Sequence, residues 1–370
     1  MKSTQPGAAA TVSQALPAEV QERLKSCPRR KPRVAMAPPP EPLIHFETLS
    51  DRPRVFRMTH ALIADAKARN KMSTPTSLGE DLRELSYLSR AVGLVTHNDV
   101  LLHPKFPLGD LAAGAPELRW IHVTGAGIEP LLPLDWLPHK VVLTNNSGVH
   151  ADKVRESSAM MLLMLNSRVP AIVTNQRRAH WQQIFTPAIR GKTVLIVGVG
   201  DMGGAVAQAA CRLGLRVLGI RRSGESHPDV DRMLRTDELD AVLPLADFVV
   251  LCAPLTSETK LLIHEDRIRL MKPGASFVNI GRAGLVDNAA LACALHEGRL
   301  SGAVVDVHDP EPLPSTSPLW GIDNLIMMPH VTSDDENQYL PKSFDLVFEN
   351  VRRLISGKEL LNVVDRERGY

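Results

Sequence analysis

VLIVGVGDMGGAVAQAACRLG, at residues 194–214, determines the fold class of this 370-residue chain. Its branched apolar start predicts a buried strand, and its alanine-rich end predicts a helix. Between them, Gly198, Gly200 and Gly203 form the pattern G-x-G-x-x-G. The first glycine permits a tight turn, the second lets the main chain approach a pyrophosphate, and the third lets the helix pack closely on the strand. The stretch therefore predicts a dinucleotide-binding unit.

Two segments of this unit should contact the dinucleotide directly. The helix is expected to begin near Met202, so that its free N–H groups and its dipole bind the phosphates. Asp201 and Met202 are therefore expected to bind the cofactor. The next predicted strand ends where an acidic residue usually binds the ribose 2′-hydroxyl of NAD. This chain has Arg221, Arg222 and Ser223 there instead. Because guanidinium groups suit a 2′-phosphate, the sequence favours NADP(H) and leaves NAD(H) as the alternative.

The rest of the chain alternates short apolar runs with segments of helical period, which is typical of α/β architecture. We expect two Rossmann-like domains, each a doubly wound parallel sheet, with the active site in the cleft between them. Residues 151–331 are predicted to form the dinucleotide-binding domain. Residues 33–150 are predicted to form a substrate-binding domain, which residues 332–370 complete. Residues 1–32 form an extension that is rich in Ala, Ser, Gln and Pro and is basic toward its end.

The same pattern places the expected strands and helices. Strands are predicted in the first half at 33–37, 93–96, 119–123 and 141–145, and in the second half at 193–197, 216–220, 247–252, 276–280, 303–307 and 325–328. Long helices are predicted at 59–70, at 151–166 and at about 335–356. The last helix follows the final strand, so we expect it to pack back on the first domain.

Composition and charge exclude several other classes of protein. The chain has 43 basic and 41 acidic side chains, so it has no general basic field for nucleic acid or an anionic membrane. No apolar run approaches the roughly 20 residues that span a bilayer, and the N-terminus lacks the apolar stretch of a secretory signal. The four cysteines are scattered without metal-ligand spacing. We therefore expect a cytoplasmic protein without a metal site or a disulfide framework.

Three reactive side chains each come just after a predicted strand of the second sheet. Arg282 lies in FVNIGRAGLVD, Glu311 in VVDVHDPEPLP and His330 in IMMPHVTS. Open α/β sheets bind their ligands at the carboxyl ends of their strands. Together, Arg282 offers a cation that could bind a carboxylate, His330 offers an acid–base group, and Glu311 offers a carboxylate to tune it.

With these motifs the chain resembles the D-isomer-specific 2-hydroxyacid dehydrogenase family, which includes glyoxylate/hydroxypyruvate reductases and phosphoglycerate dehydrogenase. The resemblance covers about residues 33–365. It rests on the glycine loop, the N-I-G-R segment that ends at Arg282, the pair Asp306 and Glu311, and the dipeptide that ends at His330. It implies NAD(P)H-dependent reduction of a 2-oxo acid to a D-2-hydroxy acid by a homodimer. Residues 175–190 would form the dimer arm.

The resemblance also implies a role for individual residues. Arg282 would bind the substrate carboxylate and the keto oxygen, His330 would donate the proton, and Glu311 would pair with His330. Asp306 would face the nicotinamide end of the cofactor. The substrate carboxylate would also be bound by a main-chain loop made of Thr124, Gly125, Ala126 and Gly127. The cofactor would further be lined by Ala253, Pro254, Leu255, Thr259, Ile280 and Gly281.

Some features depart from the family pattern and leave other functions open. Glu129 and Pro130 follow the substrate loop where a pair such as Asp-His is common, and His308 and Asp309 replace an aromatic residue followed by glutamate. The first departure puts the substrate preference in doubt. Phosphite dehydrogenase shares the fold and a similar set of residues, so phosphite oxidation is an alternative. A non-catalytic, dinucleotide-sensing corepressor is the alternative from another class. Formate dehydrogenase fits less well, because it has glutamine in the place of Glu311.

Overall fold

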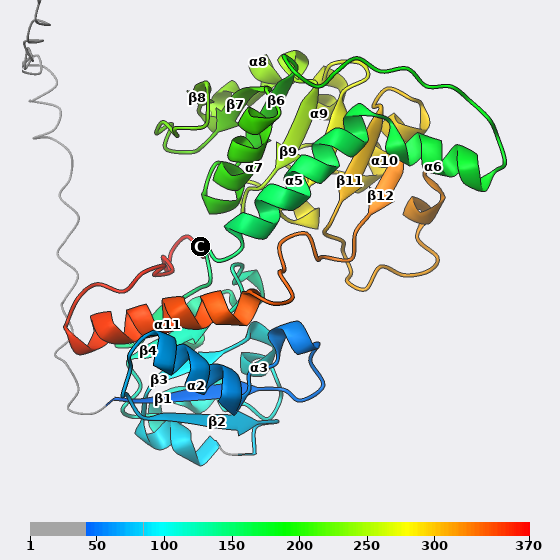
Figure 1. Ribbon diagram of the computed structural model, residues 1–370. Helices are drawn as coiled ribbons and strands as arrows, with labels where there is room; N and C mark the ends of the chain where they lie inside the picture. The colour runs from blue at the N-terminus through cyan, green and yellow to red at the C-terminus, as the bar shows by residue number, and fades with distance from the viewer. Residues whose placement is uncertain (1–41, 84) are drawn as a thin grey trace, which may run out of the picture. The chain divides into compact units, whose positions relative to one another are not determined.

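Two sheets contain all the named strands of the computed structural model, which describes residues 42–83 and 85–370 (Figure 1). All neighbouring strands within each sheet are parallel. These described residues belong to one compact unit. The prediction of an α/β fold with two parallel sheets is confirmed.

The first sheet has five strands in the order β2-β1-β3-β4-β5. Helix α11 (Tyr339–Ile355) lies beside α2 (His60–Arg69) (Figure 1). The ring of Phe46 in β1 lies 5.4 Å from that of Phe344 and 6.3 Å from that of Phe348, both in α11. A helix near the C-terminus therefore packs on the core of the first sheet. The strands are β1 (Leu43–Thr48), β2 (Thr76–Glu80), β3 (Ala91–Thr96), β4 (Trp120–Val123) and β5 (Val142–Thr144), and the short helices are α3 (Asn98–Leu101) and α4 (Leu111–Gly114).

The second sheet has seven strands in the order β12-β11-β10-β9-β6-β7-β8. Successive strands run outward from β6 in one direction and then from β9 in the other, so the strand order reverses between them. Ligands of open α/β sheets bind at such a switch point. The strands are β6 (Thr193–Val197), β7 (Arg216–Ile220), β8 (Arg232–Leu234), β9 (Phe248–Leu251), β10 (Ser276–Asn279), β11 (Gly302–Val305) and β12 (Leu325–Met327).

Helices bury both faces of the second sheet, which explains why its strands are almost continuously apolar. One core contains residues of α5 and α7, and the other contains residues of α8, α9 and α10. Helix α5 lies along α7 (Figure 1). The helices are α5 (Ala151–Asn166), α6 (Val169–Arg177), α7 (Asp201–Arg212), α8 (Leu239–Val242), α9 (Glu265–Leu270) and α10 (Asn288–His296).

Most of the expected elements are present, with differences at the edges of the sheets. The six strands predicted in the second half correspond to β6, β7, β9, β10, β11 and β12. The strand predicted at residues 33–37 lies outside the described residues. The sequence analysis missed β1 and β2, because His45 and Glu47 interrupt the apolar pattern of β1 and because β2 is short and polar. It also missed β8, which has only three residues.

Candidate active site

The three glycines after β6 each meet a different steric requirement. Gly198 has a φ of +98°, and a Cβ there would lie 2.4 Å from the amide nitrogen of Ala253. A Cβ at Gly203 would lie 2.1 Å from the carbonyl oxygen of Gly198, so α7 packs directly on the loop. By contrast, a Cβ at Gly200 would meet no atom of the protein within 4 Å. The loop is therefore crowded at two glycines and open at the glycine that should approach a pyrophosphate.

The first turn of α7 offers main-chain donors beside this open space. Gly204 donates the first hydrogen bond of the helix to the carbonyl oxygen of Gly200, at 2.7 Å. The N–H groups of Asp201, Met202 and Gly203 precede that bond and lie at the positive end of the helix dipole. The predicted residues of the glycine loop thus fit the phosphates of a dinucleotide.

Two arginines follow β7, at the carboxyl edge of the second sheet. The main chain of Arg221 donates to the carbonyl oxygen of Leu234 at 3.0 Å, and its guanidinium lies 3.6 Å from the carboxylate of Glu225. The guanidinium carbon of Arg222 lies 5.9 Å from the ring centre of Tyr370, and Ser223 is exposed. These cations are accessible where the adenosine ribose of a dinucleotide would end, so the residues fit a 2′-phosphate.

A fixed turn follows β9, next to the glycine loop. The hydroxyl of Thr259 donates to the carbonyl oxygen of Pro254 at 2.7 Å and accepts from the amide of Thr256 at 2.8 Å. Ala253 is buried against Gly198, and a Cβ at Gly281 would lie 2.9 Å from the carbonyl oxygen of Ala253. The ends of β6, β9 and β10 therefore lie side by side with their predicted cofactor residues. The remaining predicted residues of this group, Leu255 and Ile280, are half-buried and buried respectively.

Arg282 follows β10 and is held at its main chain and at its side chain. Its carbonyl oxygen accepts from the side-chain amide of Asn279 at 2.9 Å, and its Nη1 donates to the carbonyl oxygen of Gly281 at 2.7 Å. Its Nε lies 3.0 Å from Oε1 of Glu129, and its Nη2 lies 3.2 Å from Oε2 of the same residue. The arginine predicted to bind a substrate carboxylate therefore already forms a forked ion pair with a carboxylate of the protein.

The loop at residues 124–127 is fixed through its carbonyl groups. The carbonyl oxygen of Gly125 accepts from the amide of Asn146 at 3.1 Å. Those of Ala126 and Gly127 accept from the side chains of Asn145, at 2.7 Å, and Asn98, at 2.8 Å. Among the described residues, no acceptor takes the N–H groups of Gly125, Ala126 or Gly127. The loop is thus rigid and leaves three donors for an anion. Thr124, the first residue of the loop, donates its own amide to Thr96 at 2.9 Å.

His330 and Glu311 form a direct pair. Nδ1 of His330 lies 2.8 Å from Oε2 of Glu311, and Oε1 of Glu311 accepts from the amide of His308 at 2.8 Å. Burial raises the pKa of Glu311, but the hydrogen bonds from His330 and from the amide of His308 outweigh it and lower the pKa overall. The carboxylate therefore stays ionised and orients the imidazole, leaving Nε2 of His330 for proton transfer.

Asp306 is buried and holds the segment that follows His330. Its carboxylate accepts from the amides of Val331 and Thr332, at 2.9 and 3.2 Å, and from the hydroxyl of Thr332, at 2.5 Å. The resemblance placed this residue at the nicotinamide end of the cofactor. In the structure, its hydrogen bonds position the main chain beside His330.

The sequence analysis missed a buried pair beside these residues. Nδ1 of His150 lies 3.2 Å from the carbonyl oxygen of Ser333 and 3.7 Å from a carboxylate oxygen of Asp334. Burial lowers the pKa of His150, and it outweighs the charge of Asp334 and the hydrogen bond to Ser333, which raise it. No motif indicated His150, because its place depends on how two distant segments meet.

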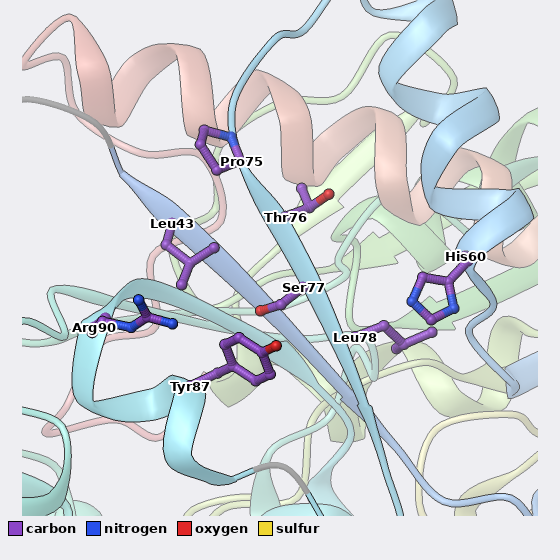
Figure 2. A pocket seen from close by; sticks show the side chains of 8 residues that line it. All are labelled: Leu43, His60, Pro75, Thr76, Ser77, Leu78, Tyr87 and Arg90. Carbon is purple, nitrogen blue, oxygen red and sulfur yellow. The ribbon is translucent and has the colours of Figure 1, made fainter.

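A separate pocket of about 540 Å³ lies beside the edge strand β2 (Figure 2). Under it, the hydroxyl of Ser77 lies 2.9 Å from Nδ1 of His45, whose Nε2 lies 3.0 Å from Oε2 of Glu47. Its lining contains none of the predicted site residues, so we do not place the active site there. The pocket is lined by Leu43, His60, Pro75, Thr76, Ser77, Leu78, Tyr87 and Arg90.

Two further properties concern the described part of the chain. Its His, Cys, Asp and Glu side chains form no group of three or more that could hold a metal ion. It also contains no helix with the length and apolar character needed to cross a membrane.

Known proteins with similar sequences and structures include 2-hydroxyacid dehydrogenases and glyoxylate reductases. Residues 159–332 match the family model for the D-isomer specific 2-hydroxyacid dehydrogenase, NAD binding domain. A glyoxylate reductase from Thermofilum pendens is 34% identical over 227 residues, which are 59% of this chain and 67% of that protein.

Two solved structures are similar over almost their whole length. A D-isomer specific 2-hydroxyacid dehydrogenase from Xanthobacter autotrophicus Py2, in complex with NADPH and MES, superposes with a TM-score of 0.75 at 26% identity. The match covers 89% of this chain and 99% of that one. An NADPH-dependent glyoxylate/hydroxypyruvate reductase from Sinorhizobium meliloti, in complex with NADP and sulfate, superposes with a TM-score of 0.72 at 25% identity. That match covers 89% of this chain and 100% of the other.

Proposed function

We propose that this chain, which belongs to the D-isomer specific 2-hydroxyacid dehydrogenase family, reduces a small 2-oxo acid to the D-2-hydroxy acid with NADPH. The observation that carries the proposal is the pair of His330 and Glu311 at the carboxyl edge of the sheet that holds the glycine loop and Arg282. The relatives and structural neighbours named as glyoxylate or hydroxypyruvate reductases support it.

Each of these residues would have its own role in the reaction. The free amides of Gly125, Ala126 and Gly127 bind the substrate carboxylate, and Arg282 binds the carboxylate and the keto oxygen. NADPH, when bound, supplies the hydride. The positive charge of Arg282 stabilises the negative charge that develops on the keto oxygen. Nε2 of His330 then gives its proton to that oxygen, and the ionised Glu311 stabilises the imidazolium form from which the proton comes.

The glycine loop and the residues after β7 support the choice of cofactor. Gly200 leaves room for a pyrophosphate, and the first turn of α7 supplies its donors. The 2′-phosphate of NADPH would be bound by Arg221, Arg222 and Ser223, and the neighbours solved with NADPH or NADP favour the same choice.

Substitution of Arg222 by alanine should raise the KM for NADPH and leave the KM for NADH unchanged. Equal changes in both KM values would contradict this assignment.

We also propose that residues 151–331 form the cofactor domain and that residues 33–150 and 332–370 form the substrate domain.

We further propose that the protein is cytoplasmic and that it forms a homodimer. Trp181 and Phe185 support the dimer, because they are 91% and 87% exposed in a single chain. Both lie in the predicted dimer arm, residues 175–190. Sedimentation of the protein and of a Trp181→Ala, Phe185→Ala variant tests this proposal. We expect a dimer and a monomer respectively, and a monomeric wild-type protein would refute it.

Initial rates of NADPH and NADH oxidation across a panel of 2-oxo acids test the proposed reaction. His330→Gln should lower kcat at least about 100-fold, because general acid catalysis contributes roughly 100- to 10,000-fold. His296→Gln, at the exposed end of α10, is the matched control and should retain full activity. Turnover that survives His330→Gln would refute the role of His330. No turnover of any 2-oxo acid would refute the reductase, and phosphite would then be tested as the substrate.

A further inference from the structure

Glu129 forms an ion pair with Arg282 beside the loop at residues 124–127. We propose that Glu129 determines specificity by restricting the active site to 2-oxo acids that carry a single carboxylate. The inference rests on the proposed function, because it requires that Arg282 and residues 124–127 bind the carboxyl end of the substrate. Glu129 begins the 3-10 helix Glu129–Leu131, directly after that loop.

The contact between Glu129 and Arg282 uses the same atoms that a substrate carboxylate would use. Nε and Nη2 of the guanidinium face the two carboxylate oxygens at 3.0 and 3.2 Å, which is the parallel, forked arrangement of a strong ion pair. The third nitrogen, Nη1, donates to the carbonyl oxygen of Gly281. All three nitrogens of Arg282 therefore have an acceptor within the protein, and a substrate carboxylate competes with Glu129 for the fork.

The ion pair lies directly over the substrate loop. A Cβ at Gly127 would lie 1.7 Å from Nη2 of Arg282 and 2.4 Å from Oε2 of Glu129. The main chain around Glu129 is anchored by the buried side chains of Ile128 and Leu131. The side chain of Glu129 itself is only 20% exposed. Because its main chain is fixed, the carboxylate of Glu129 stays near the carboxyl end of any substrate bound to the loop.

The charges in this part of the site balance before a substrate binds. Arg282 and Glu129 cancel, and the free amides of the loop can offset one carboxylate of a 2-oxo acid. When the first carboxylate of a substrate takes the fork of Arg282, Glu129 loses its partner. A second carboxylate on the substrate would then face the charge of Glu129 in a half-buried site, where such repulsion is weakly screened.

A matched pair of substrates isolates this effect. 2-Oxopentanoate and 2-oxoglutarate have the same five-carbon chain and differ at the far end, where the first has a methyl group and the second a carboxylate. We would measure kcat/KM for both with NADPH in the wild-type protein, in Glu129→Gln and in Glu129→Asp. The ratio of the two values cancels any effect of the substitution on steps that both substrates share.

We expect the wild-type protein to prefer 2-oxopentanoate and Glu129→Gln to reduce that preference at least about tenfold, because the isosteric amide removes the like charge. Glu129→Asp keeps the charge and should keep the preference within about threefold of the wild-type value. A preference that is the same in Glu129→Gln as in the wild-type protein overturns the inference.

Calorimetric titration of both acids into the protein with NADP⁺ gives a readout without turnover. If the wild-type protein reduces other 2-oxo acids but neither of these two, the proposed function stands and binding alone tests Glu129. If it reduces no 2-oxo acid, the proposed function fails. A gain in affinity of Glu129→Gln for 2-oxoglutarate that exceeds its gain for 2-oxopentanoate supports the inference. Equal gains, or no binding of either acid, overturn it.

Discussion

His330 has a φ of +56°, which places an ordinary L-residue in the left-handed region. This conformation costs about 1–2 kcal/mol, so the surrounding contacts must maintain it. Asp306 supplies these contacts, because its buried carboxylate holds the amides of Val331 and Thr332. The residue directly after β11 thus sets the place of the proposed proton donor, which lies three residues after the end of β12.

Substitution of Asp306 by asparagine tests this positioning role. The amide NH₂ group cannot accept the hydrogen bonds that the main chain and the hydroxyl of Thr332 donate to Oδ2, so the segment with His330 should shift. We expect kcat to fall at least about tenfold, while the Kd for NADPH, measured by fluorescence titration, stays within about threefold. Thr332→Ser keeps the hydroxyl donor and serves as the control. A weakened Kd that accounts for the whole loss would instead assign Asp306 to the cofactor, as the resemblance implies.

The site residues differ in how far the sequence could predict them. Arg282, Glu311 and His330 each follow a strand, and the carboxyl ends of parallel strands share one edge, so their approach could be anticipated. The pair of Glu129 and Arg282 joins positions 153 residues apart. Its geometry depends on how Ile128 and its neighbours pack, which no local pattern encodes.

The unit made of strand β6, the glycine loop and helix α7 was the easiest to predict from the sequence. Each of its three glycines meets a different steric requirement. Strands β1 and β2 are the opposite case. His45 and Glu47 lie in β1 and are fully buried, because they bond to each other and His45 also bonds to Ser77 of β2. Cross-strand bonds thus replace the apolar alternation by which a strand is usually detected. Burial of polar groups through such pairing could not be inferred from one strand alone.

Two alanine substitutions in the glycine loop should separate folding from cofactor binding. Gly203→Ala pushes a Cβ into the carbonyl oxygen of Gly198, so it should cost about 2 kcal/mol of unfolding free energy and weaken NADPH binding. Gly200→Ala meets only open space and should change stability by less than about 0.5 kcal/mol. It should still weaken NADPH binding at least about tenfold. Urea denaturation and fluorescence titration measure the two effects, and unchanged NADPH binding by Gly200→Ala would contradict the proposed pyrophosphate site.

The whole molecule should lose stability in mild acid because of two buried histidines of the first sheet. Burial, with a contribution from the charge of Arg52, lowers the pKa of His97 to about 3, and burial lowers that of His122 to about 4. In the unfolded chain both would titrate near pH 6.5, so below that pH the unfolded state binds more protons than the native state. The free energy of unfolding therefore falls as the pH falls from about 6.5 toward 4.

Urea denaturation at pH 7 and pH 5 measures this loss. Each histidine should contribute on the order of 2 kcal/mol over that interval. His97→Asn or His122→Asn should flatten the pH dependence, whatever its effect on stability at pH 7. His139→Gln, at an exposed position, should leave the slope unchanged. A slope that is the same in both buried variants as in the wild-type protein would show that these histidines do not cause it.

The packing of α11 on β1 affects how the chain folds during its synthesis on the ribosome. Phe46 is among the first described residues to emerge, yet its partners Phe344 and Phe348 emerge almost 300 residues later. At roughly 5–20 residues per second, that interval lasts about 15–60 seconds. During this time the nascent first sheet exposes an apolar face, while the second sheet has all its strands by residue 327. The part of the chain that is synthesised first is therefore the part that completes its fold last.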